Sequence, residues 1–171
     1  MRPLAPLLAL LALAGCTPDL PEDVFSVYIE APVSARDSAQ ATVALPVSGV
    51  QVSVLKIAVV KAEQFVNTEV VEAGPRDIRS TYLLVQLDAR VAKPLMSLTS
   101  GAEARGKQLV LVVNDEPIGL MRLEQPVLDG NLFFAVERPG MGGAAAAAYW
   151  SRRMNESILL YRKWLEEEGK R

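Results

Sequence analysis

Few residues in this chain have side chains suited to covalent or acid–base chemistry. The sequence has no histidine and one cysteine, which excludes Ser-His-Asp and Cys-His catalysis, histidine-ligated metals and a disulfide framework. Ser53 and Lys56 have the S-x-x-K spacing of serine–lysine hydrolases, in which the serine attacks and the lysine helps to activate it. That mechanism needs both residues on one helix face, whereas here they occupy a strand-like run, and the companion S-D-N and K-T-G motifs are missing. We therefore expect no catalytic residues.

Two further motifs are better explained by structure than by ligand binding. Residues 140–145 fit a relaxed G-x-G-x-x-A dinucleotide motif, but a Rossmann unit also needs a following strand and an acidic residue about 20 positions on. Because only a helix follows here, a glycine hinge is the favoured interpretation. Asp129 occupies one predicted hairpin turn, and the neighbouring residues Asp115 and Glu116 occupy another. Carboxylates at such turns are usually solvated. We expect neither a cofactor nor a metal site, and the formal net charge of −2 does not indicate a nucleic-acid partner.

The N-terminus has the pattern of an export signal. Arg2 precedes an apolar run at residues 4–13, which is shorter than the roughly 20 residues that a membrane-spanning helix requires. The run ends in the letters LAGC at residues 13–16, which resemble the lipobox of bacterial lipoproteins. The resemblance implies cleavage between Gly15 and Cys16 and acylation of the Cys16 thiol. The alternative is an ordinary secretory signal followed by an incidental cysteine.

Acylation at Cys16 would make membrane lipid the first partner of the protein. Several acyl chains hold a protein firmly at a membrane, because a single chain binds only marginally. Thr17 stands where an aspartate would resemble the inner-membrane retention signal of two-membrane bacteria, so we expect the outer membrane, on its periplasmic side. The chain then divides into a signal peptide at 1–15, a lipidated cysteine and linker at 16–24, and one domain at 25–168.

The domain is predicted to contain a sheet and two helices. Alternating residues and β-branched clusters indicate strands, and apolar residues three or four apart indicate helices. Strand 109–113 has no polar face, which is typical of a central strand covered on both sides. The fold class is α+β: a mainly antiparallel sheet with one short and one long C-terminal helix packed on it. Strands are expected at 25–31, in two pieces within 42–54, at 65–72, 81–87, 109–113, 118–123 and 132–136, and helices at 88–98 and 144–168.

The first helix poses a question at Pro94. Asp88 is expected to cap this helix, with Val91, Leu95 and Leu98 on its buried face. Proline removes a backbone donor and clashes with the preceding turn. The helix is therefore expected either to kink at Pro94 or to begin later, with Pro94 in its first turn.

The long helix has an apolar stripe and one aromatic residue outside it. The stripe, which includes Trp150, Met154, Ile158 and Tyr161, is expected to face the core. Trp164 falls off the stripe, so we expect it to be exposed. Together with Asp115 and Glu116, which precede the strand at 118–123, Trp164 is a candidate partner surface.

Residues 83–158 contain a series of short landmarks. In order, they are a strand ending in Leu87-Asp88, the strand 109–113, the Asn114-Asp115 turn before Pro117, and Asp129-Gly130 before the strand 132–136 and an Ala-rich helix. With these landmarks, the segment resembles the head of the first periplasmic domain of SecD, an accessory component of the bacterial Sec export machinery. The resemblance implies the fold of a binding head and passive contact with an extracytoplasmic polypeptide. It does not include the transmembrane motor of SecD, because no apolar run of spanning length follows the signal. Segments 45–49 and 117–119 also resemble segments of small bacterial lipoproteins. This second resemblance implies no particular activity.

These observations together favour a binding protein over an enzyme. We expect a membrane-anchored, extracytoplasmic lipoprotein that acts as a binding or accessory module for an envelope protein or an exported polypeptide. Two alternatives stay open at this point. One is a scaffold lipoprotein that stabilises an envelope assembly, and the other is a cell-wall hydrolase that uses Ser53 and Lys56.

Overall fold

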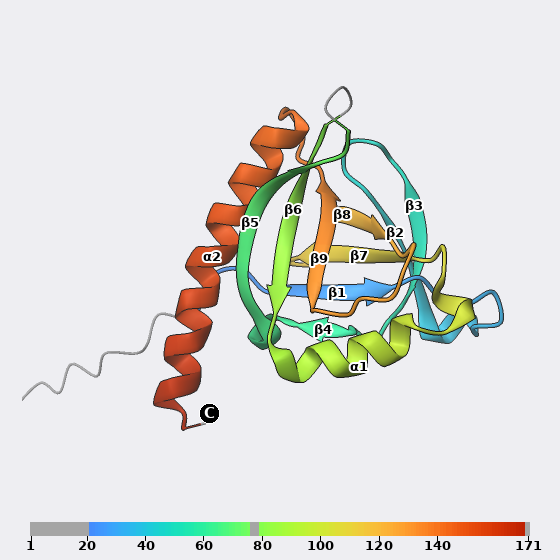
Figure 1. The fold of residues 1–171 in the computed structure, drawn as a ribbon, viewed down its shortest axis with the longest axis horizontal. Coiled ribbons are helices and arrows are strands. Elements are labelled where there is room, and N and C mark those ends of the chain that lie inside the picture. Colours follow the sequence, from blue (N-terminus) through green and yellow to red (C-terminus); the bar gives the residue numbers. More distant parts are fainter. Residues whose placement is uncertain (1–20, 76–78, 170–171) are drawn as a thin grey trace, which may run out of the picture.

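A computed structural model describes residues 21–75 and 79–169 of the chain. The signal segment, Gly15 and Cys16 lie outside these residues. The structure confirms the α+β class: a curled seven-stranded antiparallel sheet, a two-stranded hairpin and two α-helices (Figure 1). The helices are α1 (Ala89–Thr99) and α2 (Gly143–Glu167), and the strands are β1 (Phe25–Ile29), β2 (Gln40–Ala44), β3 (Gln51–Leu55), β4 (Val60–Lys61), β5 (Phe65–Ala73), β6 (Ser80–Leu87), β7 (Gln108–Val113), β8 (Glu116–Arg122) and β9 (Asn131–Val136).

The large sheet curls around one hydrophobic core. Its strand order is β4-β1-β7-β8-β9-β6-β5, and in Figure 1 the strands β5, β6 and β9 run across the direction of β1, β7 and β4. Alternate residues on each strand point into the space between the two halves. Phe25, Leu111, Leu83 and Phe134 are fully buried there, one from each of β1, β7, β6 and β9. The curl therefore lets one sheet cover most of its own apolar face.

Strand β7 is covered on both sides, as its sequence predicts. Leu109 and Leu111 face the main core, whereas Val110 and Val112 pack against Val52 of the β2–β3 hairpin and its neighbours. A polar residue on either face of β7 would therefore be buried, which explains why the strand has no polar side.

Helix α1 runs through Pro94, so of the two alternatives the one in which the helix begins later, with Pro94 in its first turn, is wrong. It begins at Ala89, and the Asp88 carboxylate accepts a hydrogen bond from the Arg90 N–H at 2.8 Å, as predicted for a cap. The buried face is also corrected: Leu98 is exposed and Thr99 is buried in its place. Burial of Val91 and Leu95 on the same face holds the helix on both sides of Pro94.

Helix α2 covers the β5–β6–β9 half of the sheet (Figure 1). Trp150, Met154 and Ile158 are buried as predicted, and Tyr161 is half-buried. The Asn155 side chain satisfies the backbone of Thr68 on the edge strand β5, since it accepts from the Thr68 N–H and donates to the Thr68 carbonyl, both at 2.8 Å. The helix thereby covers a sheet edge that would otherwise present unpaired groups.

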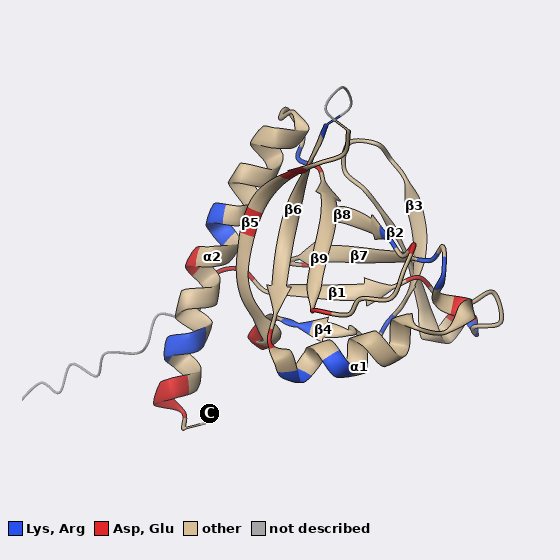
Figure 2. Cartoon of the chain, in the orientation of Figure 1, with Lys and Arg blue, Asp and Glu red and all other residues tan. Residues whose placement is uncertain are grey.

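The surface of α2 alternates in charge. Basic and acidic residues follow one another along its length (Figure 2), which is typical of a solvated helix face. None of the helices in the described part of the chain has the length and apolar character to cross a membrane.

Candidate functional site

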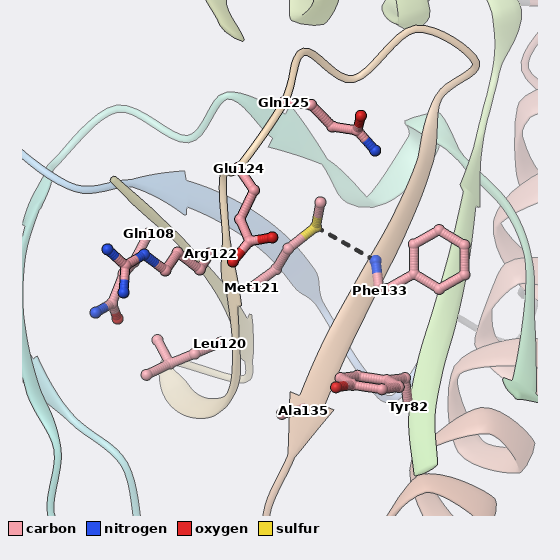
Figure 3. Close-up of a pocket in the computed structure, with 9 residues that line it drawn as sticks. All are labelled: Tyr82, Gln108, Leu120, Met121, Arg122, Glu124, Gln125, Phe133 and Ala135. Atoms are coloured by element: carbon pink, nitrogen blue, oxygen red, sulfur yellow. Dashed lines mark hydrogen bonds between the residues drawn. The ribbon is translucent and has the colours of Figure 1, made fainter. Parts of the chain in front are cut away.

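An open groove lies where β8 and β9 separate. We call it the β8–β9 groove; its volume is about 500 Å³, within the range of sites that hold small ligands or side chains. Figure 3 shows Gln108 and Arg122 on one side, Phe133 and Tyr82 on the other, and Met121 reaching toward Phe133. The lining residues are Tyr82, Gln108, Leu120, Met121, Arg122, Glu124, Gln125, Phe133 and Ala135.

The groove exists because β8 and β9 are paired over a very short length. Their register contains Gly119 opposite Val136 and Leu120 opposite Ala135. At Gly119 the strands are so close that a Cβ atom would lie 2.7 Å from Val136 Cγ1 and 2.9 Å from the Ala135 carbonyl oxygen. Beyond this contact each strand stays with its other neighbour, β8 with β7 and β9 with β6. The curled sheet therefore opens on one side of a tight glycine contact.

The opening leaves a backbone donor of β9 facing the groove. The N–H of Phe133 points toward β8, where it donates to the Met121 sulfur at 3.3 Å. In a regular antiparallel ladder this donor would meet a carbonyl oxygen of the next strand. A thioether sulfur is a weak acceptor, so the Phe133 N–H is only weakly satisfied within the chain.

The opposite side of the groove has a buried acceptor. The Gln108 Oε1 atom is the one buried side-chain oxygen or nitrogen without a hydrogen-bond partner among the residues described. The backbone of Gln108 is fixed, because its N–H donates to the Glu30 carboxylate at 2.9 Å and its carbonyl accepts from the Glu30 N–H at 2.8 Å. Buried polar groups are nearly always bonded, so an unpaired buried oxygen is an exception in this fold.

The walls of the groove are apolar and its rim is polar. Leu120 and Tyr82 are half-buried, and Phe133 is 41% exposed although its strand neighbours Leu132 and Phe134 are fully buried. Arg122 and Glu124 lie at the rim with opposite charges. An apolar centre with a polar rim is the arrangement found at protein-binding surfaces.

A second cavity of about 340 Å³ lies between the end of β9 and α2. It borders an ion pair in which Arg153 Nη2 lies 2.6 Å from Asp23 Oδ1, and the Asp23 side chain is almost fully buried. The hydrogen bonds that Arg153 donates to Asp23, aided by one to the Tyr149 hydroxyl, raise the pKa of the Arg153 guanidinium above its ordinary value. Asn114 also donates to Asp23 at 2.8 Å. This Asp23–Arg153–Asn114 clasp attaches the start of the domain to α2.

The same cavity is bordered by Glu137 and Arg138. Burial alone would raise the pKa of Glu137, but hydrogen bonds from Ser48 and from the Val47 N–H outweigh it and hold the pKa below its ordinary value. The guanidinium of Arg138 stacks over the Tyr149 ring, 3.5 Å from its centre. The charges of Arg153, Glu137 and Arg138 are thus each held by a neighbour, in contrast to the acceptor of Gln108.

The structure does not bring the predicted partner-surface residues together. Asp115 is exposed at the β7–β8 turn with a φ of 65°, and Glu116 borders the second cavity together with Arg153. Trp164 is half-buried and lies about 16 Å further along α2 than Arg153, from the rise of 1.5 Å per residue. Trp164 is therefore less exposed than predicted, and none of the three residues lines the β8–β9 groove.

Ser53 and Lys56 contact different partners. The Ser53 hydroxyl lies 3.3 Å from the Thr42 hydroxyl, and the Lys56 ammonium donates to the Ser38 carbonyl at 3.0 Å. The geometry thus lacks the hydrogen-bonded serine–lysine pair that the hydrolase mechanism needs. Within residues 21–75 and 79–169, no three acidic or cysteine side chains come together as candidate metal ligands.

Sequence reasoning missed the residues that form the groove. Gln108 and Met121 carry no local signal, because the groove depends on the separation of two strands. Phe133 does carry one: it is adjacent to Phe134 in a strand, so one of the two rings must point away from the core.

Comparisons with known proteins give a likeness in fold. No protein-family model matches the chain, and no curated protein matches it significantly. A solved structure described as "Structure and function of a membrane component SecDF that enhances protein export" has a similar fold, with 11% sequence identity and a TM-score of 0.48. The match covers 81% of this chain and 61% of that chain.

Proposed function

We propose that this protein is a lipid-anchored, extracytoplasmic binding module that holds an apolar segment of another polypeptide in the β8–β9 groove and catalyses no reaction. The observation that carries the proposal is the Phe133 N–H, which points into an apolar groove and meets only the Met121 sulfur at 3.3 Å. A polypeptide segment offers both a carbonyl for this donor and a side chain for the apolar wall.

The exposed ring of Phe133 supports the same function. Exposed aromatic residues beside an apolar pocket are frequent anchors of protein interfaces, because they bury a large area on binding. Tyr82 lies on the same side of the groove as this ring, and Leu120 adds apolar area on the opposite side (Figure 3). The charges at the rim, Arg122 and Glu124, are of opposite sign and favour no single charge on the partner.

The anchor and the location rest on the lipobox at residues 13–16. Acylation of Cys16 would keep the module at a membrane, where its partners would be envelope proteins or exported polypeptides. Ser53 and Lys56, the two residues of the candidate hydrolase, contact other partners in the fold.

Binding of a defined peptide tests the proposal. The probe is a short capped peptide of alternating valine and serine, titrated into the isotope-labelled protein while amide resonances are recorded. We expect saturable shifts of the groove residues, and we expect Phe133→Glu to abolish them. Val70→Glu is the matched control, because Val70 is 43% exposed on β5 and lies outside the groove. No saturable shift, or equal losses in both variants, would contradict the proposal.

A further inference from the structure

Two residues that line the β8–β9 groove carry polar groups that the fold leaves poorly satisfied. The acceptor is Gln108 Oε1, on the β7–β8 side. The donor is the Phe133 N–H, on the β9 side, with a sulfur as its partner. Figure 3 shows the two residues on opposite sides of the groove, with Met121 between them.

The two groups are complementary to a polypeptide main chain. In an extended chain each residue offers an N–H and a C=O, and their direction alternates along the chain. A hydrocarbon chain has neither group, and a carboxylate has no donor. Of the ligands with both groups, a polypeptide also supplies side chains for the apolar part of the lining, which includes Leu120, Phe133 and Tyr82.

Met121 is suited to give way to such a ligand. Its side chain is unbranched and flexible, and its sulfur is a poor substitute for a carbonyl oxygen. Replacing the sulfur at Phe133 with a ligand carbonyl would therefore gain a stronger hydrogen bond with little rearrangement of the strands.

We propose that the groove recognises the main chain of its ligand: Gln108 Oε1 accepts a hydrogen bond from a ligand amide, while the Phe133 N–H donates to a ligand carbonyl. This inference rests on the proposed function and adds that Gln108 is a specificity-determining residue. The occupant is an extended polypeptide whose amide next to an apolar side chain is free to donate. Its sequence matters mainly through that apolar side chain.

The Gln108→Leu variant separates binding from folding. Leucine has a similar size and no acceptor, so we expect affinity for the valine–serine peptide to fall about tenfold, the ratio that corresponds to one hydrogen bond lost. In the free protein the same change removes an unsatisfied buried acceptor, so the melting temperature should stay equal or rise. Gln108→Glu keeps an acceptor at this position and should retain the affinity. A lower melting temperature for Gln108→Leu would overturn the inference, because it would show that the oxygen is already bonded in the free protein.

Methylation of the peptide amides identifies the donor. A set of peptides, each with one N-methylated amide, removes the ligand donors one at a time. One methylated peptide should bind the wild-type protein about tenfold more weakly than the unmodified peptide does. The same methylated peptide and the unmodified peptide should bind Gln108→Leu equally well, because the two groups form one hydrogen bond and their losses are not additive. If every methylated peptide loses the same affinity in both proteins, Gln108 does not accept from the ligand and the inference is wrong.

The outcomes also distinguish this inference from the proposed function. Binding that is lost in Phe133→Glu but unchanged in Gln108→Leu would leave the proposed function in place and overturn main-chain recognition by Gln108. An absence of binding by the wild-type protein would overturn both.

Discussion

Replacing Gly119 with alanine tests how closely β8 and β9 approach beside the groove. A Cβ atom at this position would lie 2.7 Å from Val136 Cγ1 and 2.9 Å from the backbone oxygen of Ala135. The side chain of Val136 has little room to move, because it is buried in the core, and the backbone oxygen belongs to a paired strand. The two strands would therefore have to separate within their short paired stretch, in which Gly119 lies opposite Val136 and Leu120 opposite Ala135.

The expected cost follows from overpacking of a dense interior. Added methyl groups in well-packed cores destabilise by about 1–3 kcal/mol, and contact with both a backbone and a buried side chain favours the upper part of that range. A loss of about 2–3 kcal/mol corresponds to a fall in melting temperature of roughly 5–10 °C for a domain of this size. Differential scanning calorimetry measures this shift directly.

Gly101→Ala is the matched control. Gly101 has a φ of −69°, and a Cβ atom there would meet nothing within 4 Å, so the melting temperature should hardly change. Because Gly119 also sets the inner end of the β8–β9 groove, Gly119→Ala should bind the valine–serine peptide more weakly than Gly101→Ala does. Equal melting temperatures for the two variants would refute the close approach of β8 and β9.

Three further predictions concern the clasp, the Glu137 carboxylate and the anchor. Arg153→Leu should destabilise the domain by about 2 kcal/mol in urea unfolding, because it leaves the buried Asp23 carboxylate without its counter-charge. Adding Asp23→Asn to the Arg153→Leu chain should recover part of this loss of stability. If no stability is recovered, the clasp is contradicted. The pKa of Glu137 is lowered from 4.5, so its stabilising contribution should be present above the unfolded pKa and be lost as the pH falls through the folded pKa; a Glu137→Gln variant with the same acid profile as the wild type would contradict this. Mass spectrometry of the envelope fraction should find a lipid-modified chain beginning at Cys16, and Cys16→Ser should abolish the modification; an unmodified thiol on a soluble chain would remove the anchor.

Local patterns were sufficient to predict the elements whose environment is uniform along their length. Strand β7 is apolar at every position from Leu109 to Val113, and it is buried on both faces. The Asp88 cap is a hydrogen bond between the Asp88 carboxylate and the N–H of Arg90, two residues further along the chain. This contact depends only on neighbouring residues, so the local sequence is enough to predict it. The Asn114 and Asp115 turn has positive φ at both residues, as the tight two-residue hairpin requires.

The orientation of α1 shows where local patterns are insufficient. Leu98 is more apolar than Thr99, so a helical stripe ending at Leu98 was the reasonable expectation. The structure buries Thr99 because its hydroxyl donates to the Leu95 carbonyl at 2.8 Å and accepts from the Val127 N–H at 3.0 Å. The second bond joins residues 28 positions apart, and no periodicity within the helix encodes it.

The groove was unpredictable for a related reason. It depends on the point at which β8 leaves β9, and that point is set by a glycine contact between strands that are joined by a loop. Gln108 became notable only when its oxygen proved to be buried without a partner. From the sequence it is an ordinary polar residue at the start of an apolar strand.

The clasp and the groove are separate in this fold, and that separation has a consequence for how the module would work. Asp23 is attached to α2 through Arg153, so any anchor at Cys16 would connect to the domain at the helix. The groove is formed by other elements, with Phe133 on β9 and Met121 on β8, and it shares no lining residue with the clasp. A partner in the groove therefore need not displace the attachment of the chain to α2. It follows that Phe133→Glu should abolish peptide binding and leave membrane association intact, whereas Cys16→Ser should do the reverse.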